Sequence, residues 1–211
     1  MFGNELRWEL IIVDDGSRDR TAQVIRELAA KDGRVRGRRL VPSCGQTTAI
    51  RMGIEVARAP LIATLDADLQ NDPADLPELI QALGANDAVV GYREIRFDGR
   101  LRRVSSWVAN KVRDAISRDR VRDTGCSLKL FRAGAIRAIP LFEGMHRFLP
   151  TLLRMHGYRV IEHAVSHRPR LAGSSKYGVR NRAWRAFHDL LVVRWMRSRF
   201  LRPDVLELGD P

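Results

Sequence analysis

Two aspartates stand one residue apart directly after a short apolar run of the chain. Residues 61–65 are typical of a buried strand, and Asp66 and Asp68 follow at its carboxyl end, where open α/β sheets place their ligands. Side chains at positions i and i+2 of an extended chain point the same way, so both carboxylates can reach one hard cation. The spacing therefore predicts a site for Mg²⁺ or Mn²⁺ that keeps positions for water and phosphate.

An acidic loop that caps the next helix is the alternative explanation of these aspartates. Asp72 before Pro73 already supplies an N-cap with proline at the first helical position, so Asp66 and Asp68 are not needed for capping. An Asp-x-Asp pattern is a weak signal by itself. Its position after a buried strand favours metal binding.

A second pair of acidic residues, Asp14 and Asp15, follows the apolar run 10–13 and precedes Gly16 and Ser17. Gly16 lets the backbone approach a ligand, and the two carboxylates can accept hydrogen bonds from base N–H and ribose hydroxyl groups. This turn suits a nucleotide. Alternatively, Asp15 or Ser17 caps the helix that follows, and for Ser17 the two interpretations are equally supported.

Basic residues gather in two further segments. Five arginines lie within one loop and the start of a helix, and they indicate an anion site more than an ordinary solvated face: Arg93, Arg96, Arg100, Arg102 and Arg103. Residues 168–178 form a basic loop with glycine and serine, suited to closing over phosphates. An ordinary flexible connector is the alternative for that loop.

Alternating strands and helices are needed to position these residues. The apolar periodicity predicts strands at 9–13, 35–41, 61–65, 87–91 and 158–165, a turn with a short strand at 123–132, and helices at 18–31, 45–57, 73–83, 104–116 and 145–155. This order predicts an α/β fold, with a mainly parallel sheet and helices on both faces.

The last periodic element, residues 181–201, interleaves aromatic residues with arginines. Trp184, Phe187, Leu191 and Trp195 recur at helical spacing. Such a helix docks on the domain, lies in a bilayer interface, or does both, and Arg194 argues against a membrane span. The chain has no run near the roughly 18 apolar residues that a spanning helix needs.

The composition fits one globular domain with anionic partners. The chain has 211 residues, is 45% hydrophobic, and carries a net charge of +12 from 37 Lys and Arg against 25 Asp and Glu. The sequence contains no strand module of aromatic and basic residues, which argues against nucleic acid. The two cysteines and five histidines show no metal-type spacing, so we expect reduced thiols and no zinc.

Taken together, these segments occur in the order expected of family 2 glycosyltransferases, and from residue 9 to about 200 the chain resembles the dolichol-phosphate mannosyltransferase and bactoprenol glucosyltransferase branch. The matching segments are Val-Asp-Asp-Gly-Ser at 13–17, Leu-Asp-Ala-Asp-Leu-Gln-Asn-Asp-Pro at 65–73, Gly-Tyr-Arg at 91–93, Asp-Thr-Gly at 123–125, and 170–177 with Ser-Lys-Tyr. The resemblance implies a GT-A fold over residues 1–178, followed by a basic amphipathic helix at 179–202 and a polar tail at 203–211. It also implies inverting, metal-dependent transfer of a mannose- or glucose-type hexose from a GDP- or UDP-sugar to a polyprenyl phosphate.

The resemblance also implies roles for particular residues. Asp14 and Asp15 would contact the nucleoside, and Asp66 and Asp68 would bind the metal that bridges the diphosphate, with Asp66 also at the nucleotide and Gln70 completing the site. Arg93 would contact sugar or phosphate. Asp123 would be an acidic active-site residue that orients groups or serves as base for a hydroxyl acceptor. The residues implied at the phosphates or the acceptor are Arg103, Arg170, Ser175 and Lys176.

Two departures from the family keep alternatives open. The family normally begins with a central strand and a helix that nothing before Leu10 matches, so this chain is expected to start late, with unpaired strand edges. Many relatives carry membrane-spanning helices after the catalytic domain, whereas this chain is expected to attach peripherally at the cytoplasmic face of the membrane. Transfer to a soluble hydroxyl acceptor and a truncated, inactive binding protein are the alternatives.

Overall fold

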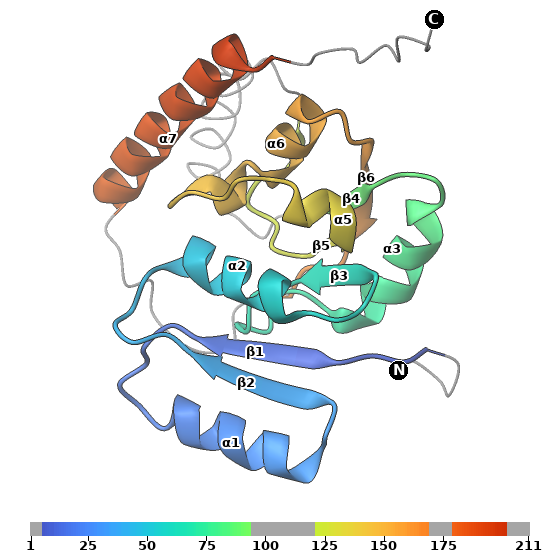
Figure 1. Ribbon diagram of the computed structural model, residues 1–211, viewed down its shortest axis with the longest axis vertical. Coiled ribbons are helices and arrows are strands. Elements are labelled where there is room, and N and C mark those ends of the chain that lie inside the picture. The colour runs from blue at the N-terminus through green and yellow to red at the C-terminus, as the bar shows by residue number, and fades with distance from the viewer. Residues whose placement is uncertain (1–5, 94–120, 169–178, 202–211) are drawn as a thin grey trace, which may run out of the picture.

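The structure is a computed structural model that describes residues 6–93, 121–168 and 179–201. In these residues the strands form two sheets (Figure 1). The smaller sheet pairs β1 (Leu10–Asp14) with β2 (Val35–Arg39) in parallel. The larger has the order β3-β5-β4-β6, with bounds Leu61–Thr64, Lys129–Arg132, Ala88–Arg93 and Val160–Val165.

The larger sheet is mixed: three of its four strands run in one direction, as in the mainly parallel sheet that the sequence predicts, and β5 runs against them. β5 runs antiparallel to both β3 and β4, and β4 is parallel to β6, so β3, β4 and β6 all run in one direction. Within the described ranges, β1 and β3 are each hydrogen-bonded to a strand on one side only. Their other edges have no strand partner there, in line with the expected unpaired edges.

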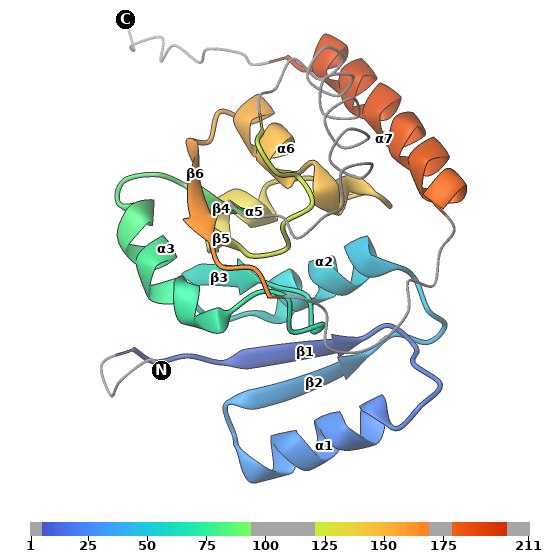
Figure 2. The same cartoon turned by 180° about the vertical axis from the view of Figure 1, so that it is seen from behind.

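Helices cover both faces of the larger sheet (Figures 1 and 2). On one face α3 buries Leu79 and Leu83 against Leu128 and Leu130. The opposite face carries Phe131, because side chains alternate along β5. The helices are α1 (Thr21–Lys31), α2 (Gln46–Val56), α3 (Leu76–Leu83), α5 (Ala133–Arg137), α6 (Leu149–Met155) and α7 (Val179–Arg199), with 3₁₀ turns η1 (Pro73–Asp75) and η2 (Met145–Arg147).

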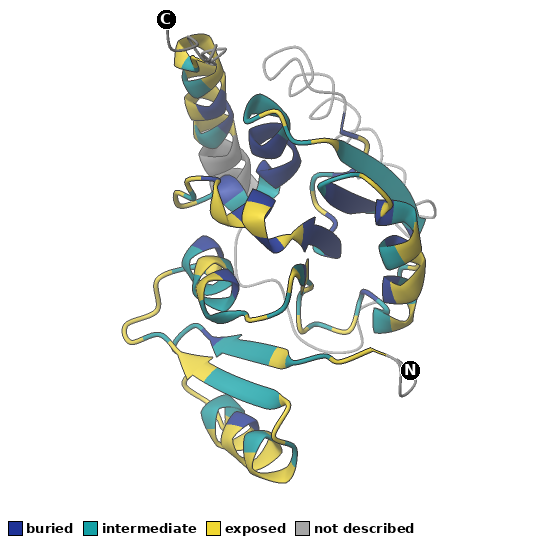
Figure 3. Ribbon diagram, turned by 45° about the vertical axis from the view of Figure 1, so that its right-hand side comes forward, coloured by how far each residue is buried: buried dark blue, intermediate teal, exposed yellow. Residues whose placement is uncertain are grey.

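The main core lies on the Phe131 face, where α2, α5, α6 and α7 meet the sheet. Leu152 and Leu153 of α6 are fully buried there, and so is Val193 of α7. Figure 3 shows α6 largely buried, whereas α1 and β2 are mostly intermediate or exposed. In α1 the buried residue is Ile25, which packs over Gly37 of β2 so closely that a Cβ at Gly37 would clash with it.

The predicted elements agree with the observed ones to within a few residues, with two differences in type. Pro73 opens η1 before α3 begins, and Pro150 lies at the start of α6 after η2, so two predicted helices each begin as a 3₁₀ turn. Helix α5 was not predicted, since its five residues are too short for a clear period. The predicted helix 104–116 lies outside the described residues.

We expect Gly91→Ala to destabilise the protein by about 1–3 kcal/mol, because added atoms in a filled core force their neighbours to move. Gly91 lies in β4, where a Cβ would stand 2.8 Å from the Leu128 carbonyl oxygen and 3.0 Å from Cys126 Sγ. Urea unfolding measures the change in the free energy of unfolding.

Gly134→Ala is the matched control, because a Cβ at Gly134 in α5 meets nothing within 4 Å. Alanine there should raise the free energy of unfolding by about 0.5–1 kcal/mol, as it does at other helical glycines. Equal effects of the two substitutions would show that Gly91 is not tightly enclosed.

Candidate functional site

The structure places Asp66 and Asp68 just beyond the end of β3, as predicted. Gln46 Nε2, at the start of α2, donates to Asp66 Oδ1 at 2.8 Å. Asp68 Oδ1 accepts from the backbone N–H of Gln70 at 3.2 Å. Leu69, between Asp68 and Gln70, has a φ of 62°, a strained value for a residue with a side chain. The loop therefore holds both carboxylates in a defined turn.

Burial raises the pKa of Asp66, and the neighbouring Asp68 carboxylate raises it further. The two effects are distinct, loss of hydration and repulsion by a like charge, but both disfavour a negative charge at this position. The pKa is raised even though Lys129 and the hydrogen bonds from Gln46 and Ser127 act in the opposite direction. The repulsion between the two carboxylates is thus only partly compensated.

A divalent cation fits this donor set. Mg²⁺ is usually held by one or two carboxylates together with water and substrate phosphates. In the described ranges no three His, Cys, Asp or Glu side chains gather to form a complete protein cage. Asp66 and Asp68 would therefore hold the cation from one side and leave its other positions to a ligand.

Asp14 and Asp15 at the end of β1 are both engaged with the protein. The Asp14 side chain is buried, accepts from the Ser17 backbone N–H at 2.9 Å, and lies 3.4 Å from Arg39 Nε. Its hydrogen bonds with Ser17 are the main reason why its pKa lies below the usual value.

Asp15 fixes the loop that leads into α2. Its Oδ1 accepts from the Cys44 backbone N–H at 2.6 Å, and its Oδ2 accepts from Ser43 Oγ and the Gly45 backbone N–H, both at 2.9 Å. Asp15 therefore holds the loop before α2 rather than capping α1, which was the expected alternative. Gln46, the first residue of α2 after this loop, donates to Asp66.

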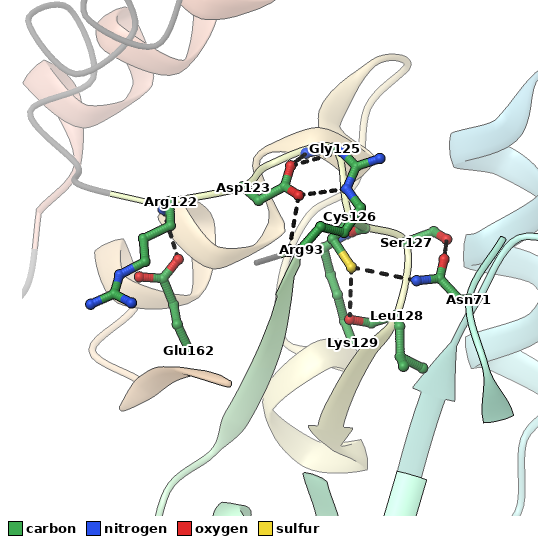
Figure 4. A network of polar contacts seen from close by, with 10 residues as sticks. All are labelled: Asn71, Arg93, Arg122, Asp123, Gly125, Cys126, Ser127, Leu128, Lys129 and Glu162. Carbon is green, nitrogen blue, oxygen red and sulfur yellow. Dashed lines mark hydrogen bonds and ion pairs between the residues drawn. The ribbon is translucent and has the colours of Figure 1, made fainter. Parts of the chain in front are cut away.

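Arg93 and Asp123, both predicted as site residues, form an ion pair (Figure 4). Arg93 Nε donates to Asp123 Oδ2 at 2.7 Å and Nη2 donates to Oδ1 at 3.0 Å, a bidentate geometry. The Asp123 carboxylate is 4% exposed, and its Oδ1 also accepts from the Gly125 backbone N–H. This arrangement supports an orienting role for Asp123 over a role as general base.

Four residues of the site were missed by sequence reasoning: Gln46, Asn71, Ser127 and Lys129. Ser127 Oγ accepts from the Asp66 backbone N–H at 3.1 Å and donates to Asn71 Oδ1 at 2.7 Å. Lys129 is buried in β5, where burial lowers its pKa. A lysine directly before the apolar residues Leu130 and Phe131 is the signal that could have pointed to this network.

A histidine also lies next to the start of α2. His146 Nδ1 and Thr47 Oγ1 are 2.7 Å apart, and Thr47 Oγ1 accepts from the Gly144 backbone N–H at 3.0 Å. Burial, together with the positive charges of Arg147 and Lys129, lowers the pKa of His146 to about 4. His146 is therefore neutral at pH 7.

The remaining predicted residues, Arg103, Arg170, Ser175 and Lys176, lie outside the described residues. The segment that leads to Arg170, Ser175 and Lys176 is nevertheless bonded to the loop that carries Asp66 and Asp68. The Arg168 backbone N–H donates to the Gln70 carbonyl at 2.9 Å, and the Arg168 side chain pairs with Asp72. The segment before residue 169 therefore ends beside Gln70 and Asp72, which follow Asp68 in the chain.

Comparisons with known proteins identify similar sequences. Residues 4–139 match the family model described as Glycosyl transferase family 2. The dodecaprenyl-phosphate galacturonate synthase of Rhizobium johnstonii is 42% identical over 203 residues, which cover 93% of this chain and 60% of the relative. The undecaprenyl-phosphate 4-deoxy-4-formamido-L-arabinose transferase of Edwardsiella ictaluri is 37% identical over 175 residues, covering 82% and 54%. The chain thus spans between half and two thirds of the length of these relatives.

Solved structures share the fold. The glucosyl-3-phosphoglycerate synthase of Mycobacterium tuberculosis, in complex with Mn²⁺, UDP-glucose and phosphoglyceric acid, superposes with a TM-score of 0.63 at 18% identity, covering 89% of this chain and 69% of that one. A complex of the same enzyme with Mg²⁺ and UDP gives the same score. The predicted GT-A fold is confirmed.

We expect Asp66→Asn to stabilise the metal-free protein at pH 7. A carboxyl group whose pKa is raised by folding lowers stability once it ionises, so the cost is absent below the unfolded pKa near 3.8 and complete above the folded pKa. Asparagine removes the charge and keeps an oxygen for Gln46. Thermal melting without divalent metal should show a higher Tm.

Asp14→Asn is the matched contrast, because the pKa of Asp14 is lowered by folding. The stabilisation from Asp14 is present above pH 3.8 and is lost as the pH falls through the lower folded value. Asp14→Asn should therefore lower the Tm at pH 7. Shifts of the same sign for both variants would contradict the assigned environments.

Proposed function

The chain belongs to glycosyl transferase family 2, and on that premise we propose that it transfers a hexose-type sugar from a nucleotide-diphosphate sugar to a polyprenyl phosphate. The proposal depends above all on the partly buried Asp66–Asp68 pair, which suits a cation shared with a diphosphate. The names of the two relatives, one acting on a dodecaprenyl and the other on an undecaprenyl phosphate, support the acceptor class. GDP and UDP both remain candidates for the nucleotide, and UDP is the one bound in the neighbouring structures.

In this proposal the donor lies across the carboxyl ends of β1 and β3. Asp14 and Asp15 lie at the nucleoside end, and Asp66 and Asp68 lie at the diphosphate with Gln70 beside them. Bound Mg²⁺ or Mn²⁺ would supply positive charge to the leaving diphosphate. Arg93, fixed by Asp123, would contact sugar or phosphate oxygens through its guanidinium group.

The chemical step is a single displacement at the anomeric carbon. An acceptor phosphate oxygen forms a bond to C1 while the bond from C1 to the diphosphate oxygen breaks on the opposite face, so the configuration inverts. The acceptor oxygen is already anionic near neutral pH, so no strong base is needed. Arg103, Arg170, Ser175 and Lys176 are proposed to hold the phosphates.

Helix α7 supports attachment to a membrane surface. It packs on the core through Leu190 and Val193, and it exposes Leu191 and Trp195, the latter by 61%. Arg194 is among the exposed residues of this helix. In the described ranges no helix is long and apolar enough to cross a bilayer. We therefore propose peripheral attachment at the cytoplasmic face, with α7 in the interface.

Transfer assays test the donor and acceptor. Purified protein with Mn²⁺ should move sugar from one member of a panel of UDP- and GDP-sugars, including glucose, mannose and galacturonic acid, to a polyprenyl phosphate. Asp68→Asn should lower kcat/KM by roughly 100-fold or more, because it removes a ligand to the cation that neutralises the leaving group. EDTA should abolish the transfer.

Asp87→Asn is the control, since this carboxylate lies at the start of β4, where its Oδ2 accepts from the Arg159 backbone N–H. The variant should keep wild-type kcat/KM. Transfer only to soluble hydroxyl acceptors would overturn the lipid acceptor, and wild-type activity of Asp68→Asn would overturn the metal site.

Vesicle flotation tests the membrane surface. Leu191→Glu should weaken binding to phosphatidylglycerol vesicles roughly 10-fold, because it removes apolar area from the interface and adds a negative charge that the anionic lipid repels. Leu28→Glu is the matched control: Leu28 is also 42% exposed, but it lies on α1 at the opposite end of the molecule (Figures 1 and 2). Equal binding of both variants would contradict the assignment to α7.

A further inference from the structure

One hydroxyl group joins the two ends of the loop that carries Asp66 and Asp68. Ser127 Oγ accepts from the Asp66 backbone N–H at 3.1 Å, where the loop begins. The same oxygen donates to Asn71 Oδ1 at 2.7 Å, where the loop ends. Asn71 is 7% exposed, so the second bond is shielded from water. The two ends of the loop can therefore move apart only if one of these bonds breaks.

The turn that carries Ser127 is itself held from several sides (Figure 4). Thr64 Oγ1 of β3 donates to the Ser127 carbonyl at 3.1 Å. Asn71 Nδ2 lies 3.7 Å from Cys126 Sγ, and the Leu128 carbonyl accepts from the Gly91 backbone N–H at 3.0 Å. Because β5, which follows this turn, is also paired with β3 and β4 along its length, Ser127 keeps its position when one of these side-chain contacts is lost.

Lys129 adds a buried positive charge beneath this turn. The residue is 4% exposed, and its Nζ donates to the Cys126 carbonyl oxygen. A buried ammonium group is costly unless opposite charges lie near it. Asp66 and Asp123 provide such charges, since both favour the charged form of Lys129. Lys129 therefore holds the turn at the Cys126 carbonyl, directly before Ser127.

We propose that Ser127, held in place by buried Lys129, is a positioning residue that sets the Asp66–Asp68 loop for cation and diphosphate. The inference rests on the proposed function for its ligand. The two hydrogen bonds of Ser127 Oγ, to Asp66 and to Asn71, are called the brace here, and their geometry does not depend on that function. The same turn begins at Asp123, the partner of Arg93, so it also links the Asp66–Asp68 loop to the Arg93–Asp123 pair. Neither Ser127 nor Lys129 touches the reacting atoms in this scheme.

Ser127→Ala is the first test, with Thr64→Val as the matched control. Both remove a hydroxyl that hydrogen-bonds within the same network, but Thr64 Oγ1 reaches only the Ser127 carbonyl. Calorimetry with Mn²⁺ and UDP, and with Mn²⁺ and GDP, should show roughly 3- to 10-fold weaker metal-dependent nucleotide binding for Ser127→Ala. Thr64→Val should bind as the wild type does, even if its Tm falls equally.

Amide hydrogen exchange provides a readout that needs no ligand. The Asp66 amide, which donates to Ser127 Oγ, should exchange at least about 10-fold faster in Ser127→Ala and at the wild-type rate in Thr64→Val. Unchanged exchange at Asp66 would overturn the brace. Wild-type protein that binds neither nucleotide would count against the proposed function, whereas the exchange result would still decide the brace.

Lys129→Met tests whether Lys129 acts on the site through its positive charge or by holding the turn in position. A buried cation near Asp66 repels a second cation, so loss of its charge alone would tighten Mn²⁺ binding. Loss of its positioning role should instead weaken Mn²⁺-dependent nucleotide binding, as in Ser127→Ala, and Lys129→Arg should restore part of it. Tighter binding in Lys129→Met would contradict the positioning role of Lys129. If Lys129→Met does not fold, Ser127→Ala still decides the proposal.

Discussion

A carboxylate withdrawn from water beside a second carboxylate is the constraint on which the rest of the site depends. The pKa of Asp66 is raised by burial and by Asp68, so the folded chain works against the charge that a cation site requires. Gln46, Ser127 and Lys129 offset part of that cost from three different elements. The elements around β3 thus hold two mutually repelling carboxylates in place, and a cation that relieved this repulsion would be bound more strongly as a result.

Local chemistry explains which features could be predicted from the sequence. The strand before Asp66, the Asp72–Pro73 helix start and the turn after β1 each depend on neighbours within a few residues. The Asp72 cap is observed as expected, since its Oδ1 accepts from the Ala74 backbone N–H. The motif order likewise indicated the family and the fold, because it combines several such local signals.

The partners of these residues could not be predicted, because they come from distant parts of the chain. Ser127 lies 61 positions from Asp66, and Arg93 lies 30 positions from Asp123. Both Arg93 and Asp123 were expected in the site, but nothing in either segment indicated that they neutralise each other. Only the pairing of β5 with β3 and β4 brings the turn that begins at Asp123 between the two strand ends.

The pairing of Arg93 with Asp123 also bears on the choice of acceptor. A hydroxyl acceptor needs a base, and Asp123 would have to give up a buried bidentate ion pair to take the proton. Among the described residues His146 also stands beside the site, but its pKa of about 4 makes it a weak base, and its Nδ1 already contacts Thr47. A phosphate acceptor needs neither residue, because its oxygen is anionic before it binds. The electrostatics of the described site therefore favour a phosphate over a hydroxyl as the nucleophile.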